Sequence, residues 1–448
     1  MASELESNGE NDPKGFKLIF RTLRYRNYRL FFGGQLISLI GTWMQTVALT
    51  WLVYRITNSV FLLGIVGFAG QLPALVFSPF AGVIADKLNK HRIVVITQIL
   101  SMVQATILAI LTLTRGIAVW HIIVLSVFLG LINAFDMPTR QSFLLEMIEN
   151  KEDLGNAIAI NSSMFNGARL IGPSIAGIII AAIGEGLCFL LNAVSYIAVI
   201  LALLAMKIPA RSAIQPAEQG VMEGFAEGFR YISGFSPIRN ILLLLALVSL
   251  LGMPYAVLMP VFARDVLHGG PNTLGFLMGA TGVGALSGAL MLASRRSVKG
   301  LAKWIPIAAA IFGVGLIGFS FSRSLLLSLI LLLIAGFGMM VQMASSNTIL
   351  QTVVEDDKRG RVMSFYTVSF IGMAPFGSLL AGSVATAIGA PYTVLGSGVV
   401  CILGGALFAN QLPALQEKIR PIYVKLGISP VVSSGIQAAS RLTGNPEE

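Results

Sequence analysis

The sequence predicts an all-α integral membrane protein with twelve transmembrane helices. Of its 448 residues, 55% are hydrophobic and only 12% are charged, about half the charged fraction of an ordinary soluble domain. The apolar residues form separate runs, each long enough to cross a hydrocarbon core of about 30 Å as a helix. The runs lie near residues 30–54, 61–85, 93–113, 119–138, 158–183, 187–206, 240–262, 273–294, 304–321, 325–347, 362–388 and 391–411.

A charged hinge at residues 82–92 separates the second run from the third. It reads Gly-Val-Ile-Ala-Asp-Lys-Leu-Asn-Lys-His-Arg, which we interpret as a turn at a membrane surface. Short loops rich in Lys and Arg remain in the cytoplasm, and 26 of the 31 Lys and Arg fall on this predicted face. Because an even number of spans returns the chain to its starting side, both termini are predicted to be cytoplasmic.

The hinge pattern Gly-x-x-Ala-Asp-Lys-x-x-Lys-x-Arg resembles the loop signature of the major facilitator superfamily, between its second and third helices. Asn89 stands where the family usually has Gly, and Asn also tolerates the left-handed turn conformation. The stretch from Leu23 to Trp51 resembles the opening of one branch, which contains the enterobactin exporter and related secretion and drug-efflux proteins. The residues that carry this second resemblance are Asn27, Tyr28, Arg29, Gln35, Ser38, Gly41, Thr42, Trp43, Met44, Gln45 and Ala48.

Composition divides the chain into two blocks of six runs, at residues 30–206 and 240–411. Polar tails at 1–29 and 412–448 flank the blocks, and a charged linker at 207–239 joins them. Apolar residues at helical spacing on one face of the linker predict an amphipathic helix on the cytoplasmic membrane surface. They are Val221, Met222, Phe225, Phe229 and Ile232.

The two blocks look like an internal repeat. A shift of 205 residues superposes Gly172 and Gly177 on Gly377 and Gly382, and it keeps the order and spacing of neighbouring matches. Resemblance to the facilitators implies two pseudo-symmetric six-helix bundles, the major facilitator fold. In such parallel repeats the substrate binds between the halves near the bilayer midplane.

Arg169 is the ionised side chain closest to the middle of a predicted span. Counted from residue 158 it lies roughly 16 Å deep, at 1.5 Å per residue. Charges inside a membrane are costly and usually face protein or water. We therefore interpret Arg169 as a cation in a central cavity, which attracts an anionic substrate or tunes a proton site. The alternative is a structural arginine bonded to carbonyls and amides of neighbouring helices.

The pattern around Arg169 resembles the fifth-helix Gly-Pro signature of facilitator antiporters. Pro173 removes a backbone hydrogen bond and the glycines permit close crossing, so we expect a bend here. The predicted bend motif comprises Gly167, Gly172, Pro173 and Gly177. Seven polar side chains are candidates for lining the same cavity, although such residues also serve helix packing: Gln35, Gln45, Asn133, Asn161, Asn166, Gln342 and Asn347.

Asp136 is the other ionised side chain within a span, near the cytoplasmic end of the fourth. The family resemblance places the hinge beside it, so we expect Asp136 to pair with Lys90 or Arg92. We also expect Asp86 to lie against the positive N-terminal end of the eleventh helix. These contacts would form a latch that closes the cytoplasmic side, or alternatively only fix loop geometry. The latch comprises Gly82, Asp86, Lys90, Arg92, Asp136 and Arg361.

Motifs of several other function classes are missing from the sequence. It contains no Gly-x-x-x-x-Gly-Lys-Ser/Thr loop, no His-Glu-x-x-His and no paired-cysteine cluster, so we predict neither ATP hydrolysis, nor an enzyme, nor a metal or other cofactor. The net charge of +10 is explained as an orientation signal, so no nucleic-acid partner is expected. A proton relay would need Asp136, Glu146 or Glu185, which leaves protons as a candidate coupling ion only.

The preferred function is export of a siderophore or an amphipathic drug-like molecule across the bacterial inner membrane by alternating access. This choice rests on the family resemblance, which also suggests proton antiport. The first alternative is translocation of a lysophospholipid or a similar lipid, and the second is a membrane sensor that binds a ligand without moving it. We expect a monomer whose partners are a small-molecule substrate and the lipid bilayer.

Overall fold

The computed structural model describes residues 21–148, 150, 153–207, 221–295 and 297–425, and only the backbone of residues 79, 82–83, 85–87, 221–225, 356 and 425. Twelve helical segments within these ranges are long and apolar enough to cross a membrane. Helices can do so because every backbone polar group is bonded within the segment. The predicted all-α, twelve-span fold is therefore confirmed.

The first half contains six crossings, preceded by the short helix η1 (Arg21–Arg24). The crossings are α2 (Arg26–Thr57), α3 (Val60–Lys87), α4 (Lys90–Leu113), α5 (Val119–Glu146), α6 (Leu154–Ile183) and α7 (Glu185–Leu204). Helix α8 (Val221–Gly234) lies in the predicted linker and packs against α14.

The second half also contains six crossings, two of which are interrupted. The seventh runs through α9 (Ser236–Leu247), η3 (Val248–Gly252), η4 (Met253–Leu258), α10 (Met259–Val261) and η5 (Phe262–Val266). The eleventh runs through α14 (Asp356–Thr367), η6 (Val368–Gly372) and α15 (Ala374–Ile388). The others are α11 (Pro271–Ala293), α12 (Leu301–Phe321), α13 (Leu325–Val353) and α16 (Ala390–Lys425).

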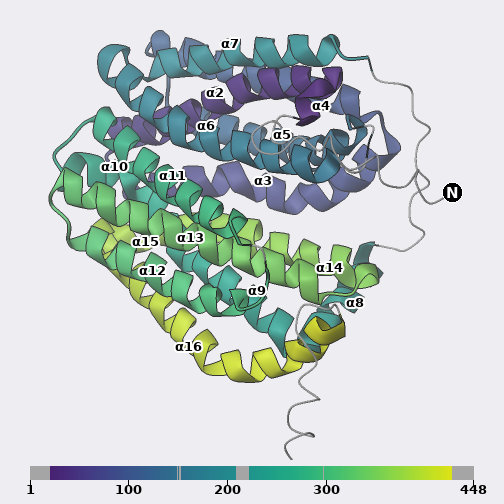
Figure 1. Ribbon diagram of the computed structural model, residues 1–448. Helices are drawn as coiled ribbons and strands as arrows, with labels where there is room; N and C mark the ends of the chain where they lie inside the picture. The colour runs from purple at the N-terminus through teal and green to yellow at the C-terminus, as the bar shows by residue number, and fades with distance from the viewer. Residues whose placement is uncertain (1–20, 149, 151–152, 208–220, 296, 426–448) are drawn as a thin grey trace, which may run out of the picture.

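Figure 1 shows the two halves stacked, with α2 to α7 above α9 to α16. We call the end at which α8 lies the linker end, and the opposite end the far end. Odd-numbered crossings run from the linker end to the far end, and even-numbered crossings return. Residue 21 and residue 425 therefore both lie at the linker end.

Two glycine crossings join the halves. A Cβ added to Gly177 of α6 would lie 2.8 Å from the Pro271 carbonyl oxygen of α11, and one added to Gly64 of α3 would lie 2.7 Å from the Ser378 carbonyl oxygen of α15. The backbones thus touch, as small residues allow in membrane bundles.

The repeat predicted from the sequence has a structural counterpart. Gly172 packs against Trp43 of α2, while its repeat equivalent Gly377 packs against Leu250 and Pro254 of the seventh crossing. The first and seventh crossings are themselves equivalent in a six-plus-six repeat. Equivalent glycines therefore contact equivalent helices, which confirms the two pseudo-symmetric bundles.

Several helices are longer than the apolar runs that predicted them, because polar residues at their ends are also helical. The hinge shortens to Leu88 and Asn89, because α3 extends to Lys87 and α4 begins at Lys90. Asn89 has φ −70° rather than the left-handed conformation, and its side chain caps α4 by accepting a hydrogen bond from the Arg92 backbone N–H. At the other end of the chain, residues 412–425 of the predicted tail belong to α16.

Candidate functional site

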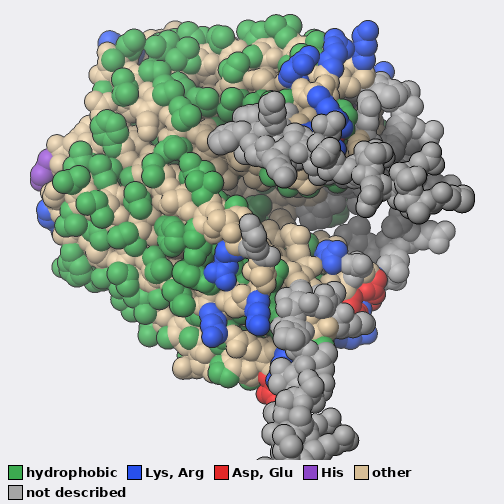
Figure 2. Space-filling view, in the orientation of Figure 1, with side chains coloured by type: hydrophobic (Ala, Val, Ile, Leu, Met, Phe, Trp, Pro, Cys, Tyr) green, Lys and Arg blue, Asp and Glu red, His purple; other side chains and the backbone are tan. Residues whose placement is uncertain are grey.

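A central opening between the halves is revealed by one face of α6. Towards the linker end this face is exposed at Ile158, Ser162 and Phe165. Towards the far end the same face is buried against α2 and α11, and Arg169 marks the change. The buried residues of the face are Gly172, Pro173, Ala176, Gly177 and Ile180. The halves therefore touch over the far part of α6 and separate over the linker part, where Figure 2 shows the surface hollowed.

Arg169 lies at the apex of this opening, near the middle of α6 and roughly 22 Å from either helix end at 1.5 Å per residue. The side chain is only half-buried. Its guanidinium carbon lies 5.6 Å from the centroid of the Trp43 ring of α2, which is cation–π distance. From the other half, Gly282 of α11 packs against the Arg169 backbone, where an added Cβ would lie 3.5 Å from the Arg169 carbonyl oxygen. Arg169 thus faces both halves.

Aromatic rings lie beside Arg169 on the side of the linker end. Phe165, one turn before Arg169, packs edge-on against Trp43 with ring centroids 5.9 Å apart. Phe165 remains 44% exposed. The apex therefore offers one cation beside apolar ring surface.

Two of the predicted cavity residues, Asn166 and Asn347, form hydrogen bonds within their own helices. Asn166 follows Phe165 on α6, and its amide donates to the Ser162 carbonyl oxygen at 2.9 Å. On α13, Asn347 accepts a hydrogen bond from the Gln351 amide at 2.6 Å. Asn347 also belongs to a cavity of about 420 Å³ at the linker end of α13 and α14, which is lined by Ala344, Asn347, Thr348, Gln351, Thr352 and Arg359.

Gln45 does not lie in the cavity, contrary to the prediction. It is 3% exposed, its amide donates to Gln104 of α4 at 2.9 Å, and its carbonyl oxygen accepts from Asn192 of α7 at 2.8 Å. Both ends of the amide are therefore used to tie three helices of the first half together. An amide group in a membrane helix gains most from such a partner.

The other predicted polar residues divide by burial. Gln35 and Gln342 are buried, and one amide atom of each has no hydrogen-bond partner among the described residues. Asn133 and Asn161 are half-buried. Among the described residues, neither Gln35 nor Gln342 forms a hydrogen bond with Arg169.

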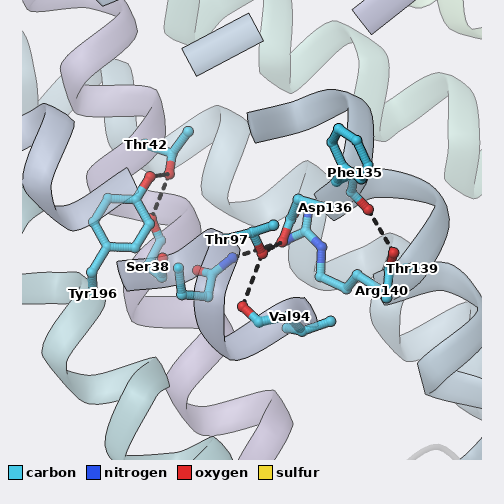
Figure 3. A network of polar contacts seen from close by, with 10 residues as sticks. Ser38, Thr42, Val94, Thr97, Phe135, Asp136, Thr139, Arg140 and Tyr196 are labelled. Atoms are coloured by element: carbon cyan, nitrogen blue, oxygen red, sulfur yellow. Dashed lines mark hydrogen bonds and ion pairs between the residues drawn. The ribbon is translucent and has the colours of Figure 1, made fainter. Parts of the chain in front are cut away.

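Asp136 does not pair with Lys90 or Arg92, which corrects the predicted pairing. Its carboxylate accepts hydrogen bonds from Thr97 and Gln98 of α4, both at 2.8 Å, and forms an ion pair with Arg140 at 3.0 Å. Figure 3 shows Asp136 between Thr97 and Arg140. The physical reason is proximity, because residues four apart in a helix share a face.

Two other residues of the predicted latch, Lys90 and Arg361, form ion pairs with residues outside the latch. Lys90 forms an ion pair with Glu146 of α5 at 3.0 Å, and Arg361 of α14 pairs with Glu227 of α8. The Arg92 side chain is exposed, and its backbone N–H donates a hydrogen bond to the Asn89 side chain at 3.1 Å. Only the backbone of residues 82 and 86 is described.

The Gly-Pro motif of α6 makes two close contacts with other helices. Gly172 packs on Trp43, Gly177 packs on α11, and Gly167 has open space where a Cβ would be. Pro173 is buried and lies inside one continuous helix. Two of the three glycines are thus explained by close helix approach.

Contacts at the far end were not predicted from the sequence. The Tyr54 hydroxyl of α2 donates to Asp265 of η5, and Arg264 donates to Asn58 at 2.7 Å. Within the first half, Arg55 pairs with Glu185 at 2.6 Å. These residues sit at the edges of apolar runs, where polar side chains are ordinary and give no sequence signal.

A charged cluster fixes η1 to the start of α6, outside the spans. Asp153 is buried, accepts a hydrogen bond from the Tyr25 hydroxyl at 2.6 Å, and pairs with Arg21 and Arg24, each at 2.8 Å. The Tyr25 hydrogen bond first, and the two arginines after it, hold the pKa of Asp153 below its ordinary value.

Comparisons with known proteins show that the chain is similar to transporters. The family model described as "Transmembrane secretion effector" matches residues 19–423. The chain is 27% identical to the staphyloferrin A transporter of Staphylococcus aureus, over 86% of this chain and 96% of that protein. It is 30% identical to the multidrug efflux pump Tap of Mycolicibacterium fortuitum, over 84% of this chain and 93% of that protein.

A solved structure shares the fold at low sequence identity. A POT family transporter in complex with 5-aminolevulinic acid has a TM-score of 0.72 and 11% identity, over 87% of this chain and 96% of that one. At this identity the likeness concerns the arrangement of helices alone. The family match over most of the chain carries more: this multi-pass membrane protein is a major facilitator transporter and belongs to the transmembrane secretion effector family.

Proposed function

We propose that the protein exports a siderophore or an amphipathic drug-like molecule by alternating access. The observation that carries this proposal is the face of α6 that is exposed on one side of Arg169 and buried on the other. Such an opening has access from one end only, as one state of an alternating transporter requires. Similarity to a siderophore transporter and to a multidrug efflux pump supports the substrate classes.

The linker end faces the cytoplasm of a bacterium in this proposal, and the protein lies in the inner membrane as a monomer. Figure 2 shows Lys and Arg gathered around the opening at this end, and Lys and Arg mark cytoplasmic surfaces. Both termini are then cytoplasmic. The conformation described here is accordingly the one that loads substrate from inside the cell.

Closure of the linker end completes the cycle. The hinge side chains and the N-terminal end of α14 approach each other across the opening when the halves rock about the glycine crossings. Asp86 is suited to that end of α14, because a carboxylate is stabilised near a helix N-terminus. The contacts at the far end, among them that of Tyr54 with Asp265, break in the same movement.

Proton antiport is the proposed energy source. Three carboxylates in spans of the first half are already in ion pairs, Asp136 with Arg140, Glu146 with Lys90 and Glu185 with Arg55. Protonation of any one of them would release a cation and change the balance between conformations. Asp136 is the most buried of the three, and we assign the coupling proton to it.

Transport into everted membrane vesicles tests the function. Accumulation of a catecholate siderophore or a cationic dye, dependent on an imposed pH gradient, is the expected result. Accumulation that persists after the gradient is collapsed would support export but contradict proton coupling. If neither compound moves under either condition, export of these classes is wrong, and labelled lysophospholipid tests lipid translocation. Binding of a ligand without movement would instead indicate a sensor.

A further inference from the structure

We propose that the cavity selects amphipathic substrates that carry an anionic group, which the Arg169 guanidinium binds while apolar parts of the substrate contact Phe165 and Trp43. This assignment of substrate chemistry rests on the proposed function. It divides the candidate substrates by charge, since an anion would be bound and a hydrophobic cation of the same shape would be rejected.

Arg169 is a cation without a protein counterion. Among the described residues, no carboxylate forms an ion pair with Arg169 and its side chain donates no hydrogen bond, whereas its guanidinium lies over the Trp43 ring. Three arginines at the ends of spans do have a counterion, since Arg55, Arg140 and Arg361 each pair with a carboxylate. Carbonyl and amide partners, which a structural arginine would need, are absent among these contacts.

The setting strengthens an ionic interaction with a ligand. A guanidinium in the middle of a span, lying over the Trp43 ring, is poorly solvated, and charges attract more strongly where the dielectric constant is low. The side chain is nevertheless partly exposed at the apex of the opening, so a ligand entering from the linker end reaches it. The planar guanidinium has several N–H donors in the geometry that carboxylate and phosphate oxygens accept.

The aromatic rings next to Arg169 indicate that the remaining part of the ligand is apolar. Trp43 already lies against the guanidinium on one side, and Phe165 presents exposed ring surface one helical turn nearer the entrance. An apolar group attached to the anion would cover Phe165 and displace water from it. The site therefore fits an amphipathic anion better than a small inorganic one.

The position between the halves also suggests how the anion is released. Arg169 belongs to α6 in the first half, and its backbone packs against Gly282 of α11 in the second. When the far end opens, the crossing of α6 with α11 separates and Arg169 loses its second-half neighbour. The guanidinium then becomes exposed to water from the far end, and water weakens its attraction for the anion.

Two probes with one fluorophore test the charge requirement. Dansylglycine carries a carboxylate and dansylcadaverine an ammonium, and energy transfer from protein tryptophan reports binding of either to the purified full-length protein in nanodiscs. We expect saturable binding of dansylglycine only. Arg169→Gln should weaken it at least about tenfold, as expected for the loss of a charged hydrogen-bond partner. Arg169→Lys keeps the charge and should retain part of the affinity.

The controls separate charge from folding. Arg115→Gln removes an exposed arginine at the far end and should leave binding unchanged. If Arg169→Gln binds dansylglycine as well as the unmodified protein does, or if dansylcadaverine binds more tightly than dansylglycine, the proposal is overturned. If Arg169→Gln does not fold, the proposal is still tested by comparing the binding of the two probes to the unmodified protein and to Arg169→Lys.

Vesicle transport distinguishes this proposal from the proposed function. Export of the cationic dye that does not need Arg169 would support export and contradict anion selection. Charge-selective binding with no transport of any compound would support the anion site and contradict export. Gradient-dependent export of anionic compounds, lost in Arg169→Gln, would support both.

Discussion

The Tyr54 hydroxyl at the end of α2 donates a hydrogen bond to the Asp265 carboxylate of η5, and this contact joins the two halves at the far end. The Arg264 guanidinium lies over the same ring, with its carbon 5.8 Å from the ring centroid, and also donates to Asn58. Four side chains from the two halves thus contact one another at the closed far end. The closed far end is stabilised by polar contacts as well as by glycine packing.

Tyr54→Phe should therefore favour opening of the far end. Loss of one such hydrogen bond costs about 1 kcal/mol, which changes the ratio of conformations roughly fivefold. Spin labels at exposed positions 183 and 388, at the far ends of α6 and α15, would show a larger population at long distance. Tyr392→Phe is the matched control, because Tyr392 is 65% exposed, and it should change nothing. Equal distance distributions in both variants would contradict this role of Tyr54.

Gly177→Ala should destabilise the described conformation, and Gly167→Ala should not. The new methyl group at residue 177 would lie 2.8 Å from the Pro271 carbonyl oxygen, whereas at residue 167 it would meet nothing within 4 Å. Overpacking of this kind costs about 1–3 kcal/mol. Thermal denaturation in detergent should show a lower midpoint for Gly177→Ala alone. Similar midpoints for the two variants would mean that α6 and α11 do not cross so closely.

Asp136 and Arg140 should be energetically coupled. Arg140→Gln alone leaves a buried carboxylate without its cation, while Asp136→Asn with Arg140→Gln removes both charges. A double-mutant cycle on the free energy of unfolding, measured by SDS titration in mixed micelles, should give a coupling of about 1–3 kcal/mol. The more exposed pair of Glu355 with Lys358 is the control and should give less than about 1 kcal/mol. Additive effects at Asp136 and Arg140 would contradict the pairing.

At low pH, protonation of Asp153 should weaken the contact between η1 and α6. Its folded pKa is below its ordinary value of about 4, so the unfolded state binds protons first as pH falls. The stabilisation is complete above the ordinary pKa and is lost as pH drops through the lower folded value. Hydrogen exchange of residues 21–25, corrected for intrinsic rates, should lose protection over that range. Asp153→Asn should show weak protection at every pH, and unchanged protection would refute the docking role of this carboxylate.

The arrangement of helices could be predicted because lipid imposes a length and a composition on each span. Polar helix ends have no such signal. Glu417, Lys418 and Arg420 belong to α16, yet in the sequence they look like a tail. The interruptions at η3 and η6 were also missed, although Pro254 and Pro375 lie close to them and prolines disturb helices.

The candidate site was predictable only where one residue was unusual by itself. Arg169 stands out as a charge in the middle of an apolar run. The ion pair of Asp136 with Arg140 follows from helical spacing, because Arg140 lies four residues later on the same helix. In contrast, the contacts of Gln45 with Gln104 and Asn192 depend on how three helices rotate about their axes, which no periodicity in the sequence specifies.

The glycine crossings at Gly64 and Gly177 have a consequence for the rate of the transport cycle. Contacts between long side chains restrict rotamers each time they form, which costs up to about 2 kcal/mol of conformational entropy per side chain. Backbone surfaces have no rotamers to lose. In the proposed transport cycle the far end would therefore separate and meet again with little entropic barrier, and turnover should depend on temperature mainly through the polar contacts that break beside these crossings.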